Sequence, residues 1–428
     1  MQYKPFSRPL GYQEALFTEL TRWSCGGVQL LSFVRICEPL KVEVLQRAFA
    51  LLHGMHPMLQ ARVVRGDSLF WRCDVDFASV PFEVQVLKKP FNFGKEYSLL
   101  GNKKIQVDKY SYRVRLFSNS DGLVEWAAVL TNHAAIDGRS IMTMFCYLDF
   151  FIQDGFKTKL NPLPMYSGVT DHLKAAGQIG REVLLYHKQG LTLWPVESPA
   201  PASKRRSQAT YRERSPALLQ SLSLYGKAHE INLSALLCAV AVKASRVLPV
   251  YHPWVEVVFP VDARKLCQPK VGLDTVGCFS AVMTLELAPE ILQVDLIVLA
   301  KWIQQQLNKR VMERESHAFD LKIDYKLQTI TDMAKEYAKK KAYFPSGICV
   351  SNVGSMRTLA SDLKYFEIEA GMLIQNHGTH PIMVITYSTT RRSVFVFGYC
   401  EPLMSKKSAL LYVERYMDLL KSLLGDVS

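Results

Sequence analysis

The sequence predicts an α/β protein of two lobes, each a mixed β-sheet flanked by helices. Three observations support this fold class. Short apolar runs typical of interior strands alternate with helix-like periodic segments along the whole chain. A stretch rich in proline, serine and arginine interrupts this pattern near the middle. The length of 428 residues is sufficient for two lobes.

In the first half, helices and strands follow one another closely. A helix ending near Gly54 is predicted by apolar residues that recur on one face: Leu45, Ala48, Phe49 and Leu52. Strands are expected over 59–63 and 123–131, the second because it is short, apolar, and rich in β-branched and aromatic residues. The next helix is indicated by a second periodic set: Ile141, Met144, Phe145, Leu148 and Ile152. The decamer TNHAAIDGRS, residues 131–140, therefore joins a strand to a helix through a tight loop.

The second half repeats this mixture. A buried helix is expected after Asn232, whose side chain suits an N-cap because it can accept a bond from an otherwise unpaired helix amide. A final amphipathic helix is expected over 405–424. Strands are expected at 255–261, 279–287, 345–353, 382–388 and 393–399.

Residues 191–216 are predicted to link the lobes, because prolines, serines and arginines replace periodic apolar residues there. The N-terminal lobe would then span 1–190 and the C-terminal lobe 217–428. We interpret the basic run at 203–214 as a solvated part of this linker. Phosphate or RNA binding is the alternative, but no nucleic-acid-binding motif accompanies the run, so we expect no nucleic-acid partner.

The formal net charge of +13 favours anionic partners. Nucleic acid, acidic lipid, coenzyme A and an acidic carrier protein all satisfy this condition, and a basic surface without a specific partner is the alternative. The nine cysteines occur singly, without a CxxC pair, as expected of free thiols in a reducing compartment. The first residues lack the pattern of a secretion signal, and no apolar run approaches the ~18 residues that cross a bilayer. We therefore expect a cytoplasmic protein without a transmembrane segment.

His133, Asp137 and Gly138 form an HxxxDG pattern where the chain leaves the strand predicted at 123–131. Neutral imidazole accepts a proton near physiological pH because its unperturbed pKa is about 6.5, so His133 is the candidate general base. Gly138 would let the backbone turn sharply and let a substrate approach closely. An ordinary turn histidine is the alternative reading of so short a pattern.

These residues resemble the signature of the coenzyme A-dependent acyltransferase superfamily, the chloramphenicol acetyltransferase-like proteins. Other segments are similar to the family in order along the chain: HPMLQARV from His56, FPVDARKL followed by VGCFSAV, SNVGSM at 351–356 and VFVFGYCEP at 394–402. The closest branch is that of alcohol acetyltransferases, polyketide-associated acyltransferases and condensation domains. Asn132 stands where condensation domains usually carry a second histidine, which favours the first two. The VFVFGY strand lacks the DFGWG of the plant BAHD enzymes.

The resemblance implies two chloramphenicol-acetyltransferase-like lobes that meet at an active-site tunnel, with His133 at its middle. His133 would deprotonate an alcohol or amine that attacks a thioester carbonyl directly, without an acyl-enzyme. Asp137 would point away from His133 and, with Gly138, brace the motif by pairing with Arg264 of the second lobe. A buried carboxylate needs such a partner, and a bidentate arginine would pin the loop that aims His133.

Ser351 and Asn352, on a second-half strand, are candidate donors to the oxyanion or substrate, and capping of a strand end is their alternative role. The expected co-substrate is a thioester of coenzyme A or of a carrier protein's phosphopantetheine. The expected acceptor is a small-molecule alcohol or amine, and no tightly bound cofactor is expected. His377 and His380 are spaced like a metal pair, but without a nearby carboxylate we expect no metal site.

Such an enzyme would act in secondary-metabolite or lipid biosynthesis. Two alternatives stay open. One is a condensation enzyme that takes its donor from a carrier protein. The other is a non-catalytic binding protein with the same fold, although retention of His133 and Asp137 favours catalysis.

Overall fold

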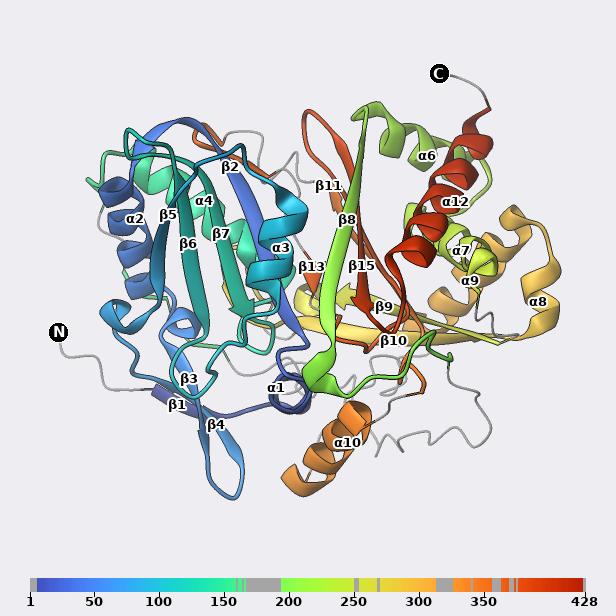
Figure 1. Cartoon of the computed structure of the whole chain (residues 1–428), viewed down its shortest axis with the longest axis horizontal. Helices are drawn as coiled ribbons and strands as arrows, with labels where there is room; N and C mark the ends of the chain where they lie inside the picture. The colour runs from blue at the N-terminus through green and yellow to red at the C-terminus, as the bar shows by residue number, and fades with distance from the viewer. Residues whose placement is uncertain are drawn as a thin grey trace.

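The computed structural model describes residues 6–158, 161–163, 165–166, 194–249, 254–267, 270–312, 326–339, 342–355, 363–368, 373–374 and 376–425. Two six-stranded sheets lie side by side in two lobes, and a three-stranded sheet lies below the first of them (Figure 1). Helices cover the outer face of the second large sheet, and α2 and α4 flank the first (Figure 1). The predicted α/β class with two sheet-containing lobes is confirmed.

Within its described residues, the first half contributes four helices and seven strands. The helices are α1 (Tyr12–Trp23), α2 (Val42–Met55), α3 (Phe93–Gly101) and α4 (Gly138–Gln153). The strands are β1 (Phe6–Pro9), β2 (Gln29–Lys41), β3 (Ala61–Arg65), β4 (Leu69–Cys73), β5 (Phe82–Val86), β6 (Tyr112–Ser118) and β7 (Leu123–Asn132). The two periodic sets predicted as helical faces are buried in α2 and α4, as expected.

The described residues of the second half form the following helices and strands. The helices are α6 (Ala217–Ala228), α7 (Leu233–Ala244), α8 (Pro289–Gln293), α9 (Leu296–Met312), α10 (Leu327–Lys339) and α12 (Lys406–Leu424). The strands are β8 (Arg206–Arg214), β9 (Val255–Asp262), β10 (Ser280–Leu287), β11 (Ile348–Ser355), β12 (Phe366–Ile368), β13 (Leu373–Ile374), β14 (Met383–Ser388) and β15 (Ser393–Glu401). Asn232 caps α7 through a 2.8 Å bond from the Ala235 amide, as predicted.

Both large sheets are mixed. The first has the order β12-β2-β7-β6-β5, with β13 also paired to β2, and its β5–β6 pair is parallel. The second has the order β10-β9-β11-β14-β15-β8, and β11 runs parallel to both neighbours. Strand β7, which leads to His133, lies in the interior of its sheet between β2 and β6.

The predicted linker at 191–216 is only partly a linker. Residues 206–214 form β8, which is paired with β15 along its whole length. This basic stretch forms a strand because an edge strand needs few apolar residues, and its charged side chains find partners on neighbouring elements. Arg212 pairs with Glu414, and Glu213 accepts from Arg392 at 2.6 Å. Residues 191–193, at the start of the predicted linker, and 167–190 lie outside the described residues.

The boundary predicted at residue 217 does not fully separate the two lobes, because the chain returns to the first sheet after this residue. Strands β12 and β13, from the second half, pair antiparallel with β2 of the first sheet. Asp149 of α4 holds this crossing by accepting from the amides of Lys364 and Tyr365 at 3.2 and 2.7 Å. In the other direction, the Asn102 amide group bonds the backbone of Ser207 in β8 at 2.8 and 3.0 Å. The first sheet is therefore completed by strands from the second half of the sequence, and one side chain of the first half bonds the second sheet.

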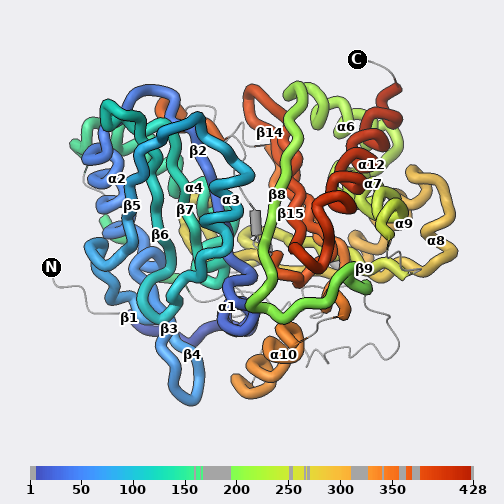
Figure 2. Tube along the Cα trace, viewed as in Figure 1, coloured from blue at the N-terminus to red at the C-terminus, as the bar shows by residue number. Residues whose placement is uncertain are grey.

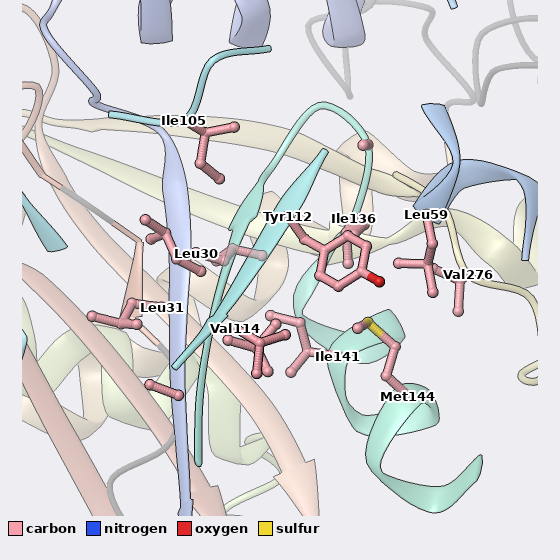
Figure 3. Packing of buried hydrophobic residues seen from close by; sticks show 14 of the residues in the cluster. Leu30, Leu31, Leu59, Ile105, Tyr112, Val114, Ile136, Ile141, Met144 and Val276 are labelled. Atoms are coloured by element: carbon pink, nitrogen blue, oxygen red, sulfur yellow. The ribbon is translucent and has the colours of Figure 1, made fainter. Parts of the chain in front are cut away.

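The core of the first lobe extends across this boundary. Val276 belongs to the same buried cluster as Leu59, Tyr112 and Ile136 of the first half, and Figure 3 shows it beside Leu59. Figure 2 places α1 at the lower end of the region where the lobes meet, and α1 packs against α10. No helix among the described residues combines the length and the apolar character needed to span a bilayer.

Candidate active site

His133 follows directly after β7, in a tight loop at the edge of the first sheet. The Asn132 carbonyl accepts from the amides of Ala135 and Ile136, both at 3.0 Å, and the Asn132 side chain accepts from the Ala134 amide at 3.1 Å. Asn132 therefore shapes the turn, and only 4% of His133 is exposed. The loop reaches the second half of the chain at Asp137, whose amide donates to the Gly277 carbonyl at 3.0 Å.

The His133 ring lies in an apolar setting. The Phe17 ring of α1 is 4.8 Å away between centroids, at an interplanar angle of 39°. Nδ1 is buried and has no hydrogen-bond partner among the described residues. The same is not true of Nε2. Burial lowers the pKa of His133 below 6.5, because the charged form loses its hydration, and the nearby charge of Asp137 only partly offsets this. The ring is therefore neutral at pH 7 and able to accept a proton.

Asp137 turns away from the histidine and is fully committed to other groups. Its Oδ1 accepts from the Ser140 amide at 2.8 Å, which caps α4, and its Oδ2 accepts from the Phe279 amide at 2.9 Å. The Arg264 guanidinium donates to both oxygens, at 2.8 and 3.0 Å. Burial alone would raise the pKa of Asp137, but the Arg264 charge and these hydrogen bonds hold it below its usual value.

Arg264 is the centre of the contact between the lobes at this point. It is 1% exposed, bonds Asp262 at 3.1 Å, and stacks over the Phe279 ring at 4.7 Å. Burial would lower its pKa, but Asp137 and Asp262 raise it above the usual value. The structure thus brings together Asp137 and Arg264, from opposite halves of the chain, as a buried bidentate pair.

Gly138 is the first residue of α4 and does not have a positive φ. The sharp turn expected of it is made instead by the Asn132 loop before it. A different glycine, Gly277, contacts the motif through its backbone and has no room for a side chain beside Phe279 of its own segment. A side chain there would meet the Phe279 ring at 2.6 Å, and the Gly277 carbonyl accepts from the Asp137 amide at 3.0 Å.

Ser140 is a site residue that the sequence reasoning missed. It is fully buried, and its hydroxyl donates to the Gly277 carbonyl at 2.8 Å. The same oxygen accepts from the Gly277 amide at 3.0 Å and from Arg264 at 2.9 Å. The sequence did contain one indication that Ser140 lies near Asp137. The two residues are three apart at the start of a predicted helix, and residues with that spacing lie on one face.

Ser351 and Asn352, the candidate oxyanion contacts, lie on β11 and are half-buried. The Asn352 amide donates to Ser234 at 3.1 Å and its oxygen accepts from the Gly354 amide at 3.0 Å. Among the described residues no hydrogen bond joins either residue to His133. The structure therefore groups Asp137, Gly138 and Arg264 around His133, and leaves Ser351 and Asn352 on another element.

Of the two histidines considered as a metal pair, His377 is buried and His380 is half-buried. His380 Nδ1 lies 2.8 Å from the Gly347 carbonyl, while both ring nitrogens of His377 lack a partner. Burial, with the charges of Arg205 and Arg206, lowers the pKa of His377 to about 4. Within the described part of the chain, no group of three or more histidine, cysteine or acidic side chains is arranged to hold a metal ion.

A small cavity lies next to the Asp137–Arg264 pair. Its lining includes Glu14 of α1, Met58, Val276, Gly277 and Phe279. The volume is about 20 Å³, which is room for a water molecule and not for a thioester. His133 does not line it, so this cavity does not form the open tunnel to the imidazole that the resemblance implies.

Comparison with known proteins supports the same family. A family profile described as the phthiocerol/phthiodiolone dimycocerosyl transferase C-terminus matches residues 205–362. No curated protein sequence matches the chain.

Solved structures with this fold cover nearly the whole chain. Polyketide synthase associated protein 5 from Mycobacterium tuberculosis is 15% identical with a TM-score of 0.67, covering 98% of both chains. Trichothecene 15-O-acetyltransferase from Fusarium sporotrichioides is 12% identical with a TM-score of 0.69, covering 97% of this chain and 94% of its own. The first condensation domain of the CDA synthetase is 15% identical with a TM-score of 0.66, covering 98% and 97%. At these identities the structures establish the fold alone. The profile match and the shared fold together fit the coenzyme A-dependent acyltransferase and condensation-domain branch, as the sequence predicted.

Proposed function

We propose that the protein transfers an acyl group from a thioester to an alcohol or amine, with His133 as general base. The observation that carries this proposal is the state of the motif. The imidazole is neutral, none of the described hydrogen bonds joins it to a carboxylate, and the carboxylate of the motif is committed to Arg264. A base that is not held by a carboxylate suits direct proton removal from an acceptor.

The steps follow from this arrangement. His133 Nε2 takes the proton of the acceptor's hydroxyl or amine as its oxygen or nitrogen attacks the thioester carbonyl carbon. The C–S bond of the tetrahedral intermediate then breaks, and the imidazolium returns the proton to the departing thiolate. Asp137 and Arg264 do not touch the reacting atoms. Their role is to hold the loop that aims His133, because a small displacement of a catalytic group sharply lowers the rate.

The donor is proposed to be acyl-coenzyme A or an acylated carrier protein in the cytoplasm. Both carry phosphate, and the net charge of +13 favours anionic donors. A hydroxyl acceptor has the support of one similar protein, whose name describes O-acetyl transfer. Carrier-dependent condensation has the support of another, a condensation domain. Measuring whether free acyl-coenzyme A is a sufficient donor separates these two sources.

The test is His133→Ala, assayed by thiol release from acyl thioesters with a mixed panel of alcohols and amines. Loss of a general base is expected to lower the rate by about 10²–10⁴-fold without unfolding the protein. His229→Ala is the control, because His229 ends α6 in the second lobe and is half-exposed. Full activity of the His133→Ala protein ends the proposal.

One observation favours a second function, a non-catalytic binding protein. Phe17 lies against His133, and the neighbouring cavity is too small for a substrate. A thioester analogue that binds without any product over long incubation, in the wild-type protein and the His133→Ala variant alike, would establish this alternative.

A further inference from the structure

Two Asp-x-Arg triplets, one from each half of the sequence, lie against each other beside the motif loop. Residues 137–139 read Asp-Gly-Arg and residues 262–264 read Asp-Ala-Arg. In each triplet the aspartate side chain caps the start of a helix. Asp137 caps α4, and Asp262 caps the short 3-10 helix Ala263–Leu266. Each triplet therefore places a capping carboxylate and a guanidinium two residues apart.

The pairing between the two triplets is reciprocal. Arg264 of the second triplet donates to both oxygens of Asp137, at 2.8 and 3.0 Å. Arg139 of the first triplet forms an ion pair with Asp262 of the second, in which Nε lies 3.7 Å from Oδ2. Asp262 also accepts from the Arg264 guanidinium at 3.1 Å, so it contacts both arginines. Each half of the chain thus supplies one anion and one cation to the same contact.

The two ion pairs differ in their exposure to solvent. The side chains of Arg264 and Asp137 are 2% and 5% exposed, whereas those of Arg139 and Asp262 are 29% and 35% exposed. Breaking a buried pair is strongly destabilising, but a half-exposed pair contributes little to stability because water screens its charges. Loss of the Arg139–Asp262 pair should therefore leave the protein folded, so that its effect on the site can be measured separately.

Asp262 is connected to the motif through the Arg264 side chain. Its Oδ1 accepts from the Arg264 amide and from Arg264 Nη1, both at 3.1 Å, which restrains that side chain at its two ends. The same Nη1 donates to Asp137 Oδ2 at 2.8 Å. Asp137 lies four residues after His133 in one loop. The orientation of the Arg264 guanidinium, and with it the position of this loop, therefore depends on Asp262.

We propose that Asp262 and Arg139 are positioning residues for His133. The inference rests on acyl transfer as the proposed function. Without the Asp262 charge, Arg264 keeps a single carboxylate partner, and the loop that carries His133 is held less precisely. A small displacement of a catalytic group sharply lowers the rate. No described hydrogen bond or ion pair joins Asp262 or Arg139 to His133, so their loss should lower kcat and leave KM within about twofold of the wild-type value.

The first test measures kcat with the donor and acceptor that the mixed panel identifies. Arg139→Gln is expected to lower kcat about two- to fivefold, and Arg139→Lys, which keeps the charge, to lower it less. Asp262→Asn should lower kcat about tenfold, because it removes the charge that both arginines share but keeps an oxygen for the Arg264 amide. The double variant should match Asp262→Asn alone, since the pair is already broken. Multiplied losses in the double variant, or an unchanged kcat in Asp262→Asn, overturn the proposal.

Asp74→Asn is the matched control. Asp74 accepts from Arg62 at 2.7 Å and pairs with Arg72 at 2.8 Å, so it is also a partly exposed carboxylate shared by two arginines. Within the described part of the chain, no hydrogen bond or ion pair joins it to the motif loop. This variant should keep the wild-type kcat. A loss equal to that of Asp262→Asn at matched thermal stability would show a general effect of charge removal and overturn the proposal.

The second test follows His133 without turnover. The histidines are labelled with ¹³C in the ring, and the His133 signal in the nuclear magnetic resonance spectrum is assigned by its loss in His133→Ala. Asp262→Asn is expected to shift or broaden this signal, and Asp74→Asn to leave it in place. A shifted signal in a protein that transfers nothing leaves the positioning role standing and rejects acyl transfer. Acyl transfer with an unshifted signal and an unchanged kcat in Asp262→Asn rejects the positioning role alone.

Discussion

His133 and Asp137 lie four residues apart in one buried loop, and their surroundings are opposite. Asp137 accepts four hydrogen bonds from Ser140, Phe279 and Arg264. His133 accepts or donates none at Nδ1, and its ring lies 4.8 Å from the Phe17 ring between centroids. Both pKa values are lowered, but that of Asp137 by a positive charge and that of His133 by burial. Asp137 therefore holds the loop to the second half of the chain, whereas Nδ1 of His133 takes no part in that bonding.

Removing the carboxylate should have the largest effect on folding. Asp137→Ala leaves Arg264 buried without its main partner, so the free energy of unfolding should fall by about 3–5 kcal/mol. Urea denaturation followed by circular dichroism measures this. The exposed Arg212–Glu414 pair supplies the control, because Glu414→Gln should change the same quantity by less than about 1 kcal/mol. An equal decrease in the free energy of unfolding in Asp137→Ala and Glu414→Gln would show that the buried pair contributes no more than the exposed one.

Ser140→Ala should have the next largest effect. It deletes a hydroxyl that serves the Gly277 carbonyl, the Gly277 amide and Arg264, and leaves buried groups unsatisfied. We expect a loss of about 1–3 kcal/mol in the free energy of unfolding, with Asp137 still paired. Ser140→Cys, which keeps a weaker donor at similar size, should recover part of it. A loss below about 0.5 kcal/mol in the alanine variant would exclude Ser140 from the brace.

Lowering the pH should destabilise the protein first through His133 and then, at lower pH, through Asp137. The His133 pKa is lowered, so below about pH 6.5 the unfolded chain binds a proton that the folded chain does not. The free energy of unfolding therefore decreases as the pH is lowered below 6.5. The Asp137 pKa is also lowered, so its contribution is complete above about pH 3.9 and is lost as pH falls through the folded value. His133→Leu should reduce the slope of unfolding free energy against pH, just below pH 6.5, by up to about 1.4 kcal/mol per pH unit. An unchanged slope would show that the ring is not protected from protonation.

At pH 7.5 the same His133→Leu substitution should have the smallest effect. Nδ1 has no partner to lose, and leucine suits the contact with Phe17, so the free energy of unfolding should change by less than about 1 kcal/mol or rise. Thermal and urea unfolding of the variant give this value. A loss near that of Asp137→Ala would mean that His133 is structural.

Much of the fold could be predicted because its strands and helices are regular. The five second-half strands expected from apolar runs are β9, β10, β11, β14 and β15, and Asn232 caps α7 as its side chain chemistry indicates. The basic stretch in β8 could not be recognised, since an edge strand has one paired side and can be largely polar. The crossing of β12 and β13 to β2 was equally hidden, because register between distant segments is set by the assembled sheets.

The site was predicted less completely. The pairing of Asp137 with Arg264 was implied by family resemblance, and physical reasoning explained only why a buried carboxylate needs such a partner. Ser140 had a detectable helical spacing. Phe17 had no signal, because its contact with His133 exists only once α1 has packed beside the loop. Contacts between segments far apart in the sequence depend on tertiary packing that periodicity does not encode.

The return of β12 and β13 to β2 has a consequence for how the chain can be divided. Expressed without the second half, the first sheet would expose the backbone groups of β2 along the edge that these strands cover. An uncovered edge of this kind recruits strands from other molecules. The first lobe is therefore not an independent module that could be exchanged without the strands that the second half of the chain supplies.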